Sequence, residues 1–210
     1  MVFFIYLHHN ELVKMSKADR TKQYIIEKTA CIFNTKGYAG TSINDLIAAT
    51  GLTKGSIYGN FENKDQVALA AFDYNFERLV AYIRGKMDTK HSAIEKLLVY
   101  PETYRNYLKN PILSSGCPVT NTSTEADDTH PLLRAKAESA YNFWRSTLEN
   151  HLNNGIIEGE IKPDIDKNEF ISVFISIMQG GILQAKVTRK MTSLNSSMDY
   201  LERYILSLKK

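Results

Sequence analysis

The residues best suited to chemistry lie between positions 53 and 58, and the chemistry they suit is hydrogen bonding to phosphate groups. This segment reads TKGSIY, so it brings hydroxyls, an ammonium group and a phenol close together. Groups of these kinds, together with helix N-termini, make many of the contacts to the phosphates of DNA. The donors in the segment are Thr53, Lys54, Ser56 and Tyr58.

Two short predicted helices would hold these donors on one outward face. We expect one helix at 43–50, opened by Ser42, and a second at 54–60, opened by Thr53. Gly51 suits the turn between them, since the left-handed backbone conformation has little steric cost only in a residue without a side chain. Four apolar residues can pack the two helices together: Leu46, Ile47, Leu52 and Ile57. The arrangement is a helix-turn-helix, whose second helix enters the major groove of DNA. The alternative is an ordinary helical hairpin with a solvated polar face.

The order of residues from 41 to 64 resembles the TetR/AcrR family of transcriptional regulators. The family pattern runs from a Thr before the first helix, through an apolar-Asp-apolar-apolar segment and a Gly turn, to a capped Lys-Gly-Ser/Thr-Leu/Ile-Tyr helix, a Phe and a Lys. The matching residues here are Thr41, Ile43, Asp45, Leu46, Ile47, Gly51, Thr53, Lys54, Gly55, Ser56, Ile57, Tyr58, Phe61 and Lys64. The strong part of the resemblance covers residues 17–67. It implies an all-α fold, in which a three-helix N-terminal domain with a helix-turn-helix is joined to a larger helical domain for ligand binding and dimerisation.

The resemblance also implies a function and a set of DNA contacts. The function is that of a ligand-responsive regulator, a repressor released from a palindromic DNA operator by a small-molecule effector. The residues implied to contact DNA are Thr41, Ser42, Thr53, Lys54, Gly55, Ser56, Tyr58 and Lys64. The sequence departs from the family pattern at Gly59 and Asn60, where bulkier aromatic or imidazole side chains are common. The operator sequence therefore does not follow by analogy.

Helix signals recur along the rest of the chain, and no segment shows sustained two-residue alternation. Ser16 and Asp19 predict a capping box, Gly37 ends that first helix, and Asn63 opens a long fourth helix. Later helices are expected at 91–109 with a break or kink at Pro101, at 131–154, at 166–190 and at 196–208. Residues 110–130, rich in Pro, Ser, Thr and Asn, are expected to be the least helical part.

These signals divide the chain into three segments. Residues 16–66 form the expected helix-turn-helix DNA-binding domain, and residues 67–210 the helical effector-binding and dimerisation domain. Residues 1–15 are either a disordered arm or a mis-called start, with Met15 as the alternative initiator. The apolar run at the very start lacks the basic leader and cleavage site of a signal peptide.

The family resemblance implies that the helices at 166–190 and 196–208 form a homodimer interface. The implied interface residues are Phe174, Met178, Gly180, Gly181, Tyr200 and Tyr204. The missing side chains at Gly180 and Gly181 would let two helices approach closely. The alternative is that these glycines line a packing seam inside one subunit.

In this family, the loops and helices between the fourth and eighth helix enclose an effector pocket. The residues implied to line it are Tyr82, Tyr100, Tyr104, Cys117, Asn121, Tyr141, Trp144 and Gln179. Each aromatic residue also has a plain alternative as core packing, because aromatic side chains are commonly buried. Cys117 is either a redox sensor or an inert buried thiol.

The composition of the chain and the spacing of its histidines and cysteines argue against several other classes of function. The excess of 26 basic over 23 acidic residues gives a net charge of +3, too small to predict nucleic-acid binding by itself. The scattered histidines and two cysteines show no metal-ligand spacing, so we expect no metal, no cofactor and no enzyme. No apolar run approaches the roughly 18 residues of a membrane span, so we expect a cytoplasmic protein with no membrane contact. The second hypothesis is a helical small-molecule-binding or protein-interaction module without DNA binding.

Overall fold

The computed structural model describes residues 16–105, 107–110 and 112–210. The expectations for residues 1–15 lie outside the described residues. The expected all-α fold is confirmed: apart from one bridge between Ile161 and Lys209, the regular structure of the described residues is helical. The helices are α1 (Lys17–Lys36), α2 (Ile43–Thr50), α3 (Lys54–Tyr58), α4 (Lys64–Met87), α5 (Ala93–Tyr104), η1 (Tyr107–Lys109), α6 (Pro118–Ala126), α7 (Pro131–Ile157), α8 (Lys167–Thr188) and α9 (Thr192–Leu206).

The helices start where the sequence offers side-chain caps. Ser16 with Asp19 and Ser42 with Asp45 form capping boxes, in which each side chain satisfies a backbone N–H of the other residue. Asn63 caps α4 by accepting a hydrogen bond from the backbone N–H of Gln66 at 3.0 Å. Gly37 ends α1 with a φ of 74°, a conformation that suits a residue without a side chain. The predicted boundaries of the first four helices therefore hold, except that α3 ends at Tyr58 rather than residue 60.

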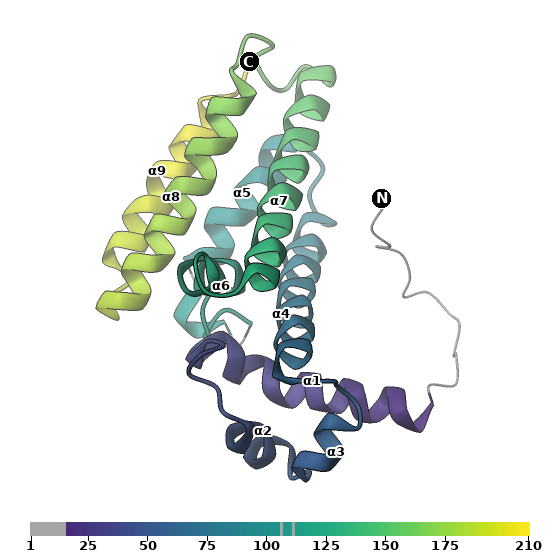
Figure 1. The fold of residues 1–210 in the computed structure, drawn as a ribbon. Helices are drawn as coiled ribbons and strands as arrows, with labels where there is room; N and C mark the ends of the chain where they lie inside the picture. The colour runs from purple at the N-terminus through teal and green to yellow at the C-terminus, as the bar shows by residue number, and fades with distance from the viewer. Residues whose placement is uncertain (1–15, 106, 111) are drawn as a thin grey trace.

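Two hydrophobic cores are stacked along α4. The smaller core joins α1, α2, α3 and the first turns of α4, including Val67 and Ala71. The larger core begins at Phe72 on the same helix and continues through α5 to α9. Figure 1 shows α4 rising out of the small domain into the bundle, while α2 and α3 lie at the opposite end of the molecule from the C-terminus. The continuous helix α4 therefore links the two parts of the chain directly.

Several segments differ from the expected helix pattern. Residues 118–126, expected to be among the least helical, form α6 with Pro118 in its first turn, where proline is well tolerated. The polar side chains of α6 are used in tertiary hydrogen bonds, such as that from Thr120 to Gln179 on α8. The last helix starts at Thr192 rather than at residue 196. Pro101 lies inside α5, which continues for one more turn and ends at Tyr104.

The apolar helix α8 belongs to the larger core. It is the one helix of the described residues with the length and composition of a membrane span. Its side chains at Phe170, Phe174 and Met178 are nevertheless buried inside the chain, where α8 packs along α9 (Figure 1). One face of α8 is therefore part of the larger core, while less than half of its apolar stretch, 44%, is buried inside the chain.

Candidate nucleic-acid interface and effector domain

The turn between α2 and α3 has the geometry that the sequence predicts. Gly51 adopts the left-handed conformation, with φ 68° and ψ 8°, and its backbone N–H donates to the Ile47 carbonyl at 2.8 Å. The Thr53 hydroxyl accepts a hydrogen bond from the backbone N–H of Ser56 at 3.1 Å, which opens α3. The two helices are therefore joined by a short, hydrogen-bonded turn.

A compact apolar core fixes α3 against its neighbours. Leu46 and Ile57 are fully buried and pack with Ile25 of α1, while Phe61 closes the core after α3. The phenol of Tyr24 donates to the carbonyl of Thr50 at 3.0 Å and ties α1 to the end of α2. These contacts hold the face of α3 that carries Ile57, and the opposite face is left exposed to solvent.

The exposed face of α3 carries most of the donors that the sequence analysis identified. Lys54 and Gly55 are exposed, and so is the capping residue Thr53. Ser56 and Tyr58 are half-buried. A Cβ at Gly55 would meet no heavy atom nearer than 4.0 Å, so the backbone here is open to an incoming molecule. The predicted DNA-contacting residues of α3 therefore lie together on one accessible surface.

The first predicted contact, Thr41, has to be corrected. Its side chain is only 1% exposed, and its hydroxyl donates to the carbonyl of Gly37 at 2.6 Å. Ser42 beside it is exposed, although its hydroxyl is shared with Asp45 in the capping box. The sequence placed both residues before α2 but could not show that the chain turns the Thr41 side chain inward. The hydroxyl of Thr41 stabilises the turn after α1 instead.

Lys64 is held by the protein itself. Its ammonium group donates to the carbonyls of Tyr38 and Thr41 at 2.9 and 3.0 Å. It also lies 4.0 Å from the centre of the Tyr38 ring, a cation–π distance. In this structure, Lys64 therefore anchors the α1–α2 turn to the start of α4.

Gly59 and Asn60, where the sequence departs from the family pattern, end α3 early. The N–H of Gly59 donates to the carbonyl of Gly55 at 2.9 Å, and the Asn60 amide donates to the carbonyl of Ser56 at 2.8 Å. A Cβ at Gly59 would lie 3.2 Å from the Gly55 carbonyl oxygen. Helix α3 is thus short, and the Asn60 side chain turns back and hydrogen-bonds to it.

The carboxylate of Asp45 joins α1 to α2 within the small domain. The Lys36 ammonium donates to its carboxylate at 2.6 Å, and the backbone N–H of Ser42 donates to it at 2.8 Å. These hydrogen bonds, Lys36 first, hold the pKa of Asp45 well below its usual value. The carboxylate therefore stays ionised and joins the end of α1 to the start of α2.

The small domain is tied to α6 of the larger domain through polar contacts that the sequence did not indicate. The Glu125 carboxylate accepts hydrogen bonds from the backbone N–H groups of Tyr38 and Ala39 at 2.9 and 2.8 Å. The Tyr38 phenol donates in turn to Asp65, and this bond raises the pKa of Tyr38 to about 12. A carboxylate far along the chain therefore fixes the turn that precedes the helix-turn-helix.

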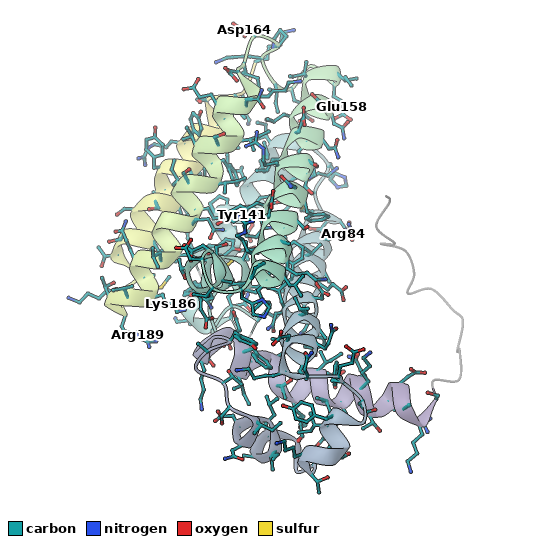
Figure 2. All side chains as sticks on the ribbon, viewed as in Figure 1. Arg84, Tyr141, Glu158, Asp164, Lys186 and Arg189 are labelled. Carbon is teal, nitrogen blue, oxygen red and sulfur yellow. The ribbon has the colours of Figure 1, made fainter. Side chains whose placement is uncertain are left out.

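A second set of contacts joins α1 to the loop before α6. Asn34 donates to the carbonyl of Gly116 at 2.9 Å, and Asn121 donates back to the carbonyl of Asn34 at 2.8 Å. Lys186 lies near the end of α8 (Figure 2), and its ammonium donates to Asn121 at 2.5 Å. Asn121, predicted to line an effector pocket, therefore lies in the junction between the two domains.

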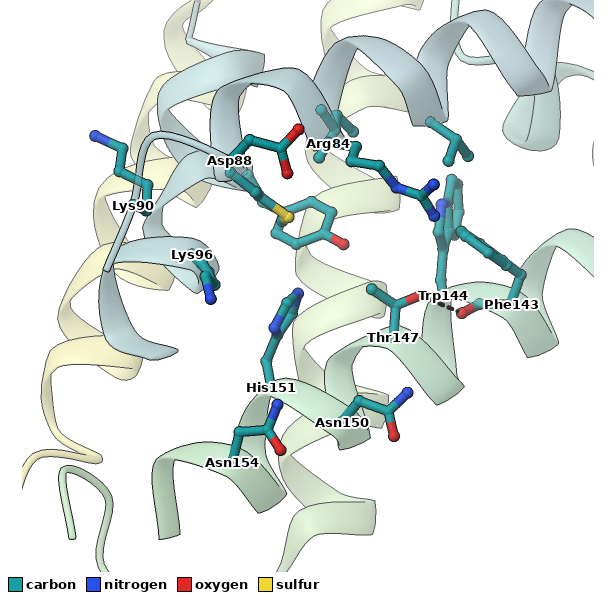
Figure 3. A pocket seen from close by; sticks show the side chains of 14 residues that line it. Arg84, Asp88, Lys90, Lys96, Phe143, Trp144, Thr147, Asn150, His151 and Asn154 are labelled. Atoms are coloured by element: carbon teal, nitrogen blue, oxygen red, sulfur yellow. Dashed lines mark hydrogen bonds between the residues drawn. The ribbon is translucent and has the colours of Figure 1, made fainter. Parts of the chain in front are cut away.

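The other residues predicted to bind a ligand fall into two groups. Tyr100 and Trp144 line a cleft of about 580 Å³ between α4, α5 and α7 (Figure 3). Tyr104 and Cys117 are fully buried in the larger core, where the side-chain oxygen of Gln179 accepts a hydrogen bond from the Thr120 hydroxyl. Tyr141 packs edge-on against Trp144, and Tyr82 lies under the ammonium of Lys86. The two groups are neighbours, because Tyr100 lies beside both the cleft and Tyr104.

The buried group contains polar atoms that the described residues leave without hydrogen bonds. These are the hydroxyls of Tyr104 and Thr103 and the amide nitrogen of Gln179. Burial raises the pKa of Tyr104 well above its usual value, and the nearby Cys117 adds to this effect. Buried polar atoms normally have partners, so this interior suits a polar group of a ligand or a water molecule.

The predicted dimer residues also have to be divided. Phe174 and Met178 are 0% and 1% exposed, and a Cβ at Gly181 would lie 3.0 Å from Leu194 of α9. Phe174 and Met178 are therefore buried in the larger core of one chain, and Gly181 packs against α9 in an internal seam. A Cβ at Gly180 would meet no heavy atom within 4 Å, and Tyr200 is 50% exposed. Tyr204 is half-buried and stacks on Phe170.

The outward face of α8 contains apolar residues that the sequence analysis did not select. Leu183 and Val187, one turn apart, are 42% and 74% exposed. With Gly180 they form a row at helical spacing on α8, and Tyr200 is a further exposed aromatic residue on α9. Because α8 is apolar on nearly all sides, its sequence alone could not distinguish this outer row from the buried one.

Two family models match the chain. Residues 25–71 match the model described as bacterial regulatory proteins, tetR family, and residues 93–201 match the tetracyclin repressor-like C-terminal domain. The two matches cover the small domain and most of the larger one.

Solved structures and characterised relatives agree with these matches. A TetR-family transcriptional regulator from Cytophaga hutchinsonii is 42% identical, covers 93% of this chain and 98% of its own, and superposes with a TM-score of 0.87. A TetR regulator from Chloroflexus aurantiacus J-10-FL is 35% identical at the same coverage and TM-score. The HTH-type transcriptional repressor DhaR of Mycobacterium sp. (strain GP1) is 24% identical over 178 residues, which are 83% of this chain and 86% of that protein. Together with the exposed helix-turn-helix, these matches establish that the chain belongs to the TetR family and is a DNA-binding transcriptional regulator rather than an enzyme.

Proposed function

We propose that this regulator is a cytoplasmic homodimeric repressor that binds a palindromic operator and is released by a small-molecule effector. The observation that carries the proposal is the exposed donor face of α3 on a domain that α6 ties to the rest of the chain. A single five-residue reading helix offers few contacts, whereas two copies about 34 Å apart meet successive turns on one face of DNA.

The DNA contacts that we propose come from the exposed surface of α2 and α3. Lys54 would bind a phosphate, and the hydroxyls of Ser42, Thr53 and Ser56 would donate to phosphate or base edges. Gly55 would let the DNA backbone approach closely, and Tyr58 would pack along the groove. Lys64 would act mainly through the turn that it holds, because two of its protons already bind the Tyr38 and Thr41 carbonyls.

The dimer would form along the outer row of α8 and the exposed side of α9. Gly180, Leu183, Val187 and Tyr200 supply an apolar surface with one close-approach position. Such exposed apolar rows on a water-soluble domain are typical of interfaces between subunits.

Release by an effector would work through the junction at α6. A ligand in the larger domain that moves α6 would change the hydrogen bonds from Glu125 to the turn at residues 38–39. The ligand would then favour a spacing of the two reading heads that no longer fits one DNA face.

The test is selection of binding sites from a pool of random DNA duplexes by the full chain. The proposal predicts an enriched palindrome bound by two chains, with affinity that falls steeply as salt increases. Sequence-blind binding, or no binding, would instead identify a helical ligand-binding or protein-interaction module and contradict the proposal.

A further inference from the structure

The cleft between α4, α5 and α7 has an apolar floor. Tyr100 and Trp144 line it from α5 and α7, together with Ile83 and Met87 of α4. These four side chains are also buried members of the larger core, so the floor of the cleft is part of that core. A volume of about 580 Å³ lies within the range of sites that hold small organic molecules.

The rim of the same cleft is predominantly basic. Arg84, Lys90 and Lys96 line it, against the single carboxylate of Asp88. Among the described residues, none of these three cations lies within ion-pair distance of a carboxylate. Figure 3 shows Arg84 extending toward Trp144, and Lys96 beside His151. Backbone hydrogen bonds from Ser92 and His91, and then the nearby charge of Lys90, lower the pKa of the Glu95 carboxyl. Lys90 therefore lies near a carboxylate, whereas no carboxylate is paired with Arg84 or Lys96 among the described residues. The rim carries an excess of positive charge, supplied mainly by Arg84 and Lys96.

His151 adds a polar group inside the cleft. It projects from α7 into the space between the helices (Figure 3), and its Nε2 atom is buried without a hydrogen-bond partner among the described residues. Asn150 and Thr147 line the cleft beside it along α7. A buried nitrogen without a partner is uncommon, and a ligand oxygen would supply the missing hydrogen bond.

From these features we infer that the cleft binds an organic anion with an aromatic or aliphatic body. The apolar part would rest on Tyr100 and Trp144, and the anionic group would lie between Arg84, Lys96 and His151. The inference rests on the proposed function and deepens it, because it names the chemical class of the effector at a site in the larger domain.

The sole tryptophan of the chain makes the inference directly measurable, because Trp144 lines the cleft. The probes are 4-phenylbutyrate, its neutral amide and 4-phenylbutylamine, which share one body and differ in charge. Each is titrated against the full chain while Trp144 fluorescence is recorded. The expected result is saturable binding of the carboxylate, about tenfold tighter than the amide, and weakest binding of the amine. Equal binding of the three, tighter binding of the amine, or no saturable change would overturn the inference.

Charge-removing variants locate the site. Lys96→Gln and Arg84→Gln should each weaken carboxylate binding several-fold while leaving binding of the amide unchanged. Lys86→Gln is the matched control, because Lys86 lies on α4 but packs over Tyr82 outside the cleft. Equal loss in the control would show that the effect comes from overall charge and would contradict the site.

The effector class and the DNA-binding function can fail separately. Operator binding is measured by mobility shift without any probe, and its absence would refute the proposed function even if the carboxylate binds. Normal operator binding with no charge preference at Trp144 would refute only the effector class.

Discussion

Single side chains on α3 divide into those that hold the helix and those that face solvent. Ile57 is fully buried in the small core, and its neighbours Lys54 and Gly55 are exposed. The sequence predicted this division, because an apolar residue between polar ones has one inward direction on a short helix. It did not predict that Thr41 turns inward, since the conformation of the turn after Gly37 is set by contacts with α4 and α6.

Lys54→Ala tests the exposed face. We expect weaker operator binding. The slope of the logarithm of the binding constant against the logarithm of salt concentration should become shallower by about one for each lysine lost, because one phosphate contact disappears per chain. Stability should be unchanged, since Lys54 is exposed. Lys210→Ala, at the far end of the molecule, is the control (Figure 1). Binding isotherms at several salt concentrations measure the effect, and identical slopes in the two variants would contradict the contact.

Ile57→Ala tests the inward face. Truncating this buried side chain should lower the free energy of unfolding by about 2–5 kcal/mol, through lost burial and a cavity in a small core. Ile157→Ala is a matched control, because Ile157 is 82% exposed and the same truncation should cost less than about 0.5 kcal/mol. Urea unfolding followed by circular dichroism gives both values. Similar losses in both variants would show that α3 is not anchored by Ile57.

At the scale of elements, α6 is the part that the sequence could not predict. Its Thr, Asn and Ser residues disfavour helix locally, and the helix forms where Thr120, Asn121 and Glu125 find partners on other elements. Such partners lie far apart in the chain, so no local pattern signals them. Helices such as α1 and α2 were predictable because their apolar periodicity and capping residues are local features of the sequence.

Glu125→Ala tests the junction between α6 and the reading domain. Removing the carboxylate leaves the N–H groups of Tyr38 and Ala39 without their acceptor. We expect amide hydrogen exchange at these two residues to become about fivefold faster or more, which corresponds to about 1 kcal/mol of lost local protection. Glu138→Ala, an exposed glutamate on α7, serves as the control. Unchanged exchange at residues 38 and 39 would mean that Glu125 does not hold the turn.

Asp45→Asn tests the capping box of α2 through its pH dependence. The lowered pKa of Asp45 means that its contribution to stability is present above the pKa of an unfolded aspartate, about 3.9, and is lost as the pH falls toward the folded value. The variant should be less stable at neutral pH and should lose less stability on acidification. Thermal unfolding between pH 7 and pH 3 compares the two proteins, and parallel curves would argue against the role of Asp45.

At the scale of the whole molecule, the sequence predicted two helical domains, but three of the residues implied for the dimer interface are packed inside one chain. Phe174 and Met178 are buried in the larger core and Gly181 packs against α9, while Leu183 and Val187 are exposed. The physical reason is that α8 is apolar on both sides, one facing its own core and one facing outward. Similarly, aromatic spacing identified Tyr100 and Trp144 at the cleft, but not the basic rim that surrounds them.

Val187→Asp tests the proposed dimer surface. A charge at a position 74% exposed in the single chain should leave the fold intact but oppose burial between two chains. We expect a monomer in sedimentation velocity and an operator affinity lowered at least about 100-fold, because each reading head must then bind alone. Ile157→Asp places the same charge at another exposed β-branched residue, on α7, and should leave the dimer intact. A Val187→Asp variant that remains dimeric would move the interface elsewhere.

Whether α3 reads DNA as part of a pair is decided by the stoichiometry and salt dependence of the complex with a duplex selected by the chain. We expect two chains per palindromic duplex, a logarithm of the binding constant that falls linearly with the logarithm of salt concentration, and a shallower slope for Lys54→Ala. Binding that ignores the sequence of the duplex, or that is unaffected by changes on the exposed face of α3, would contradict this role.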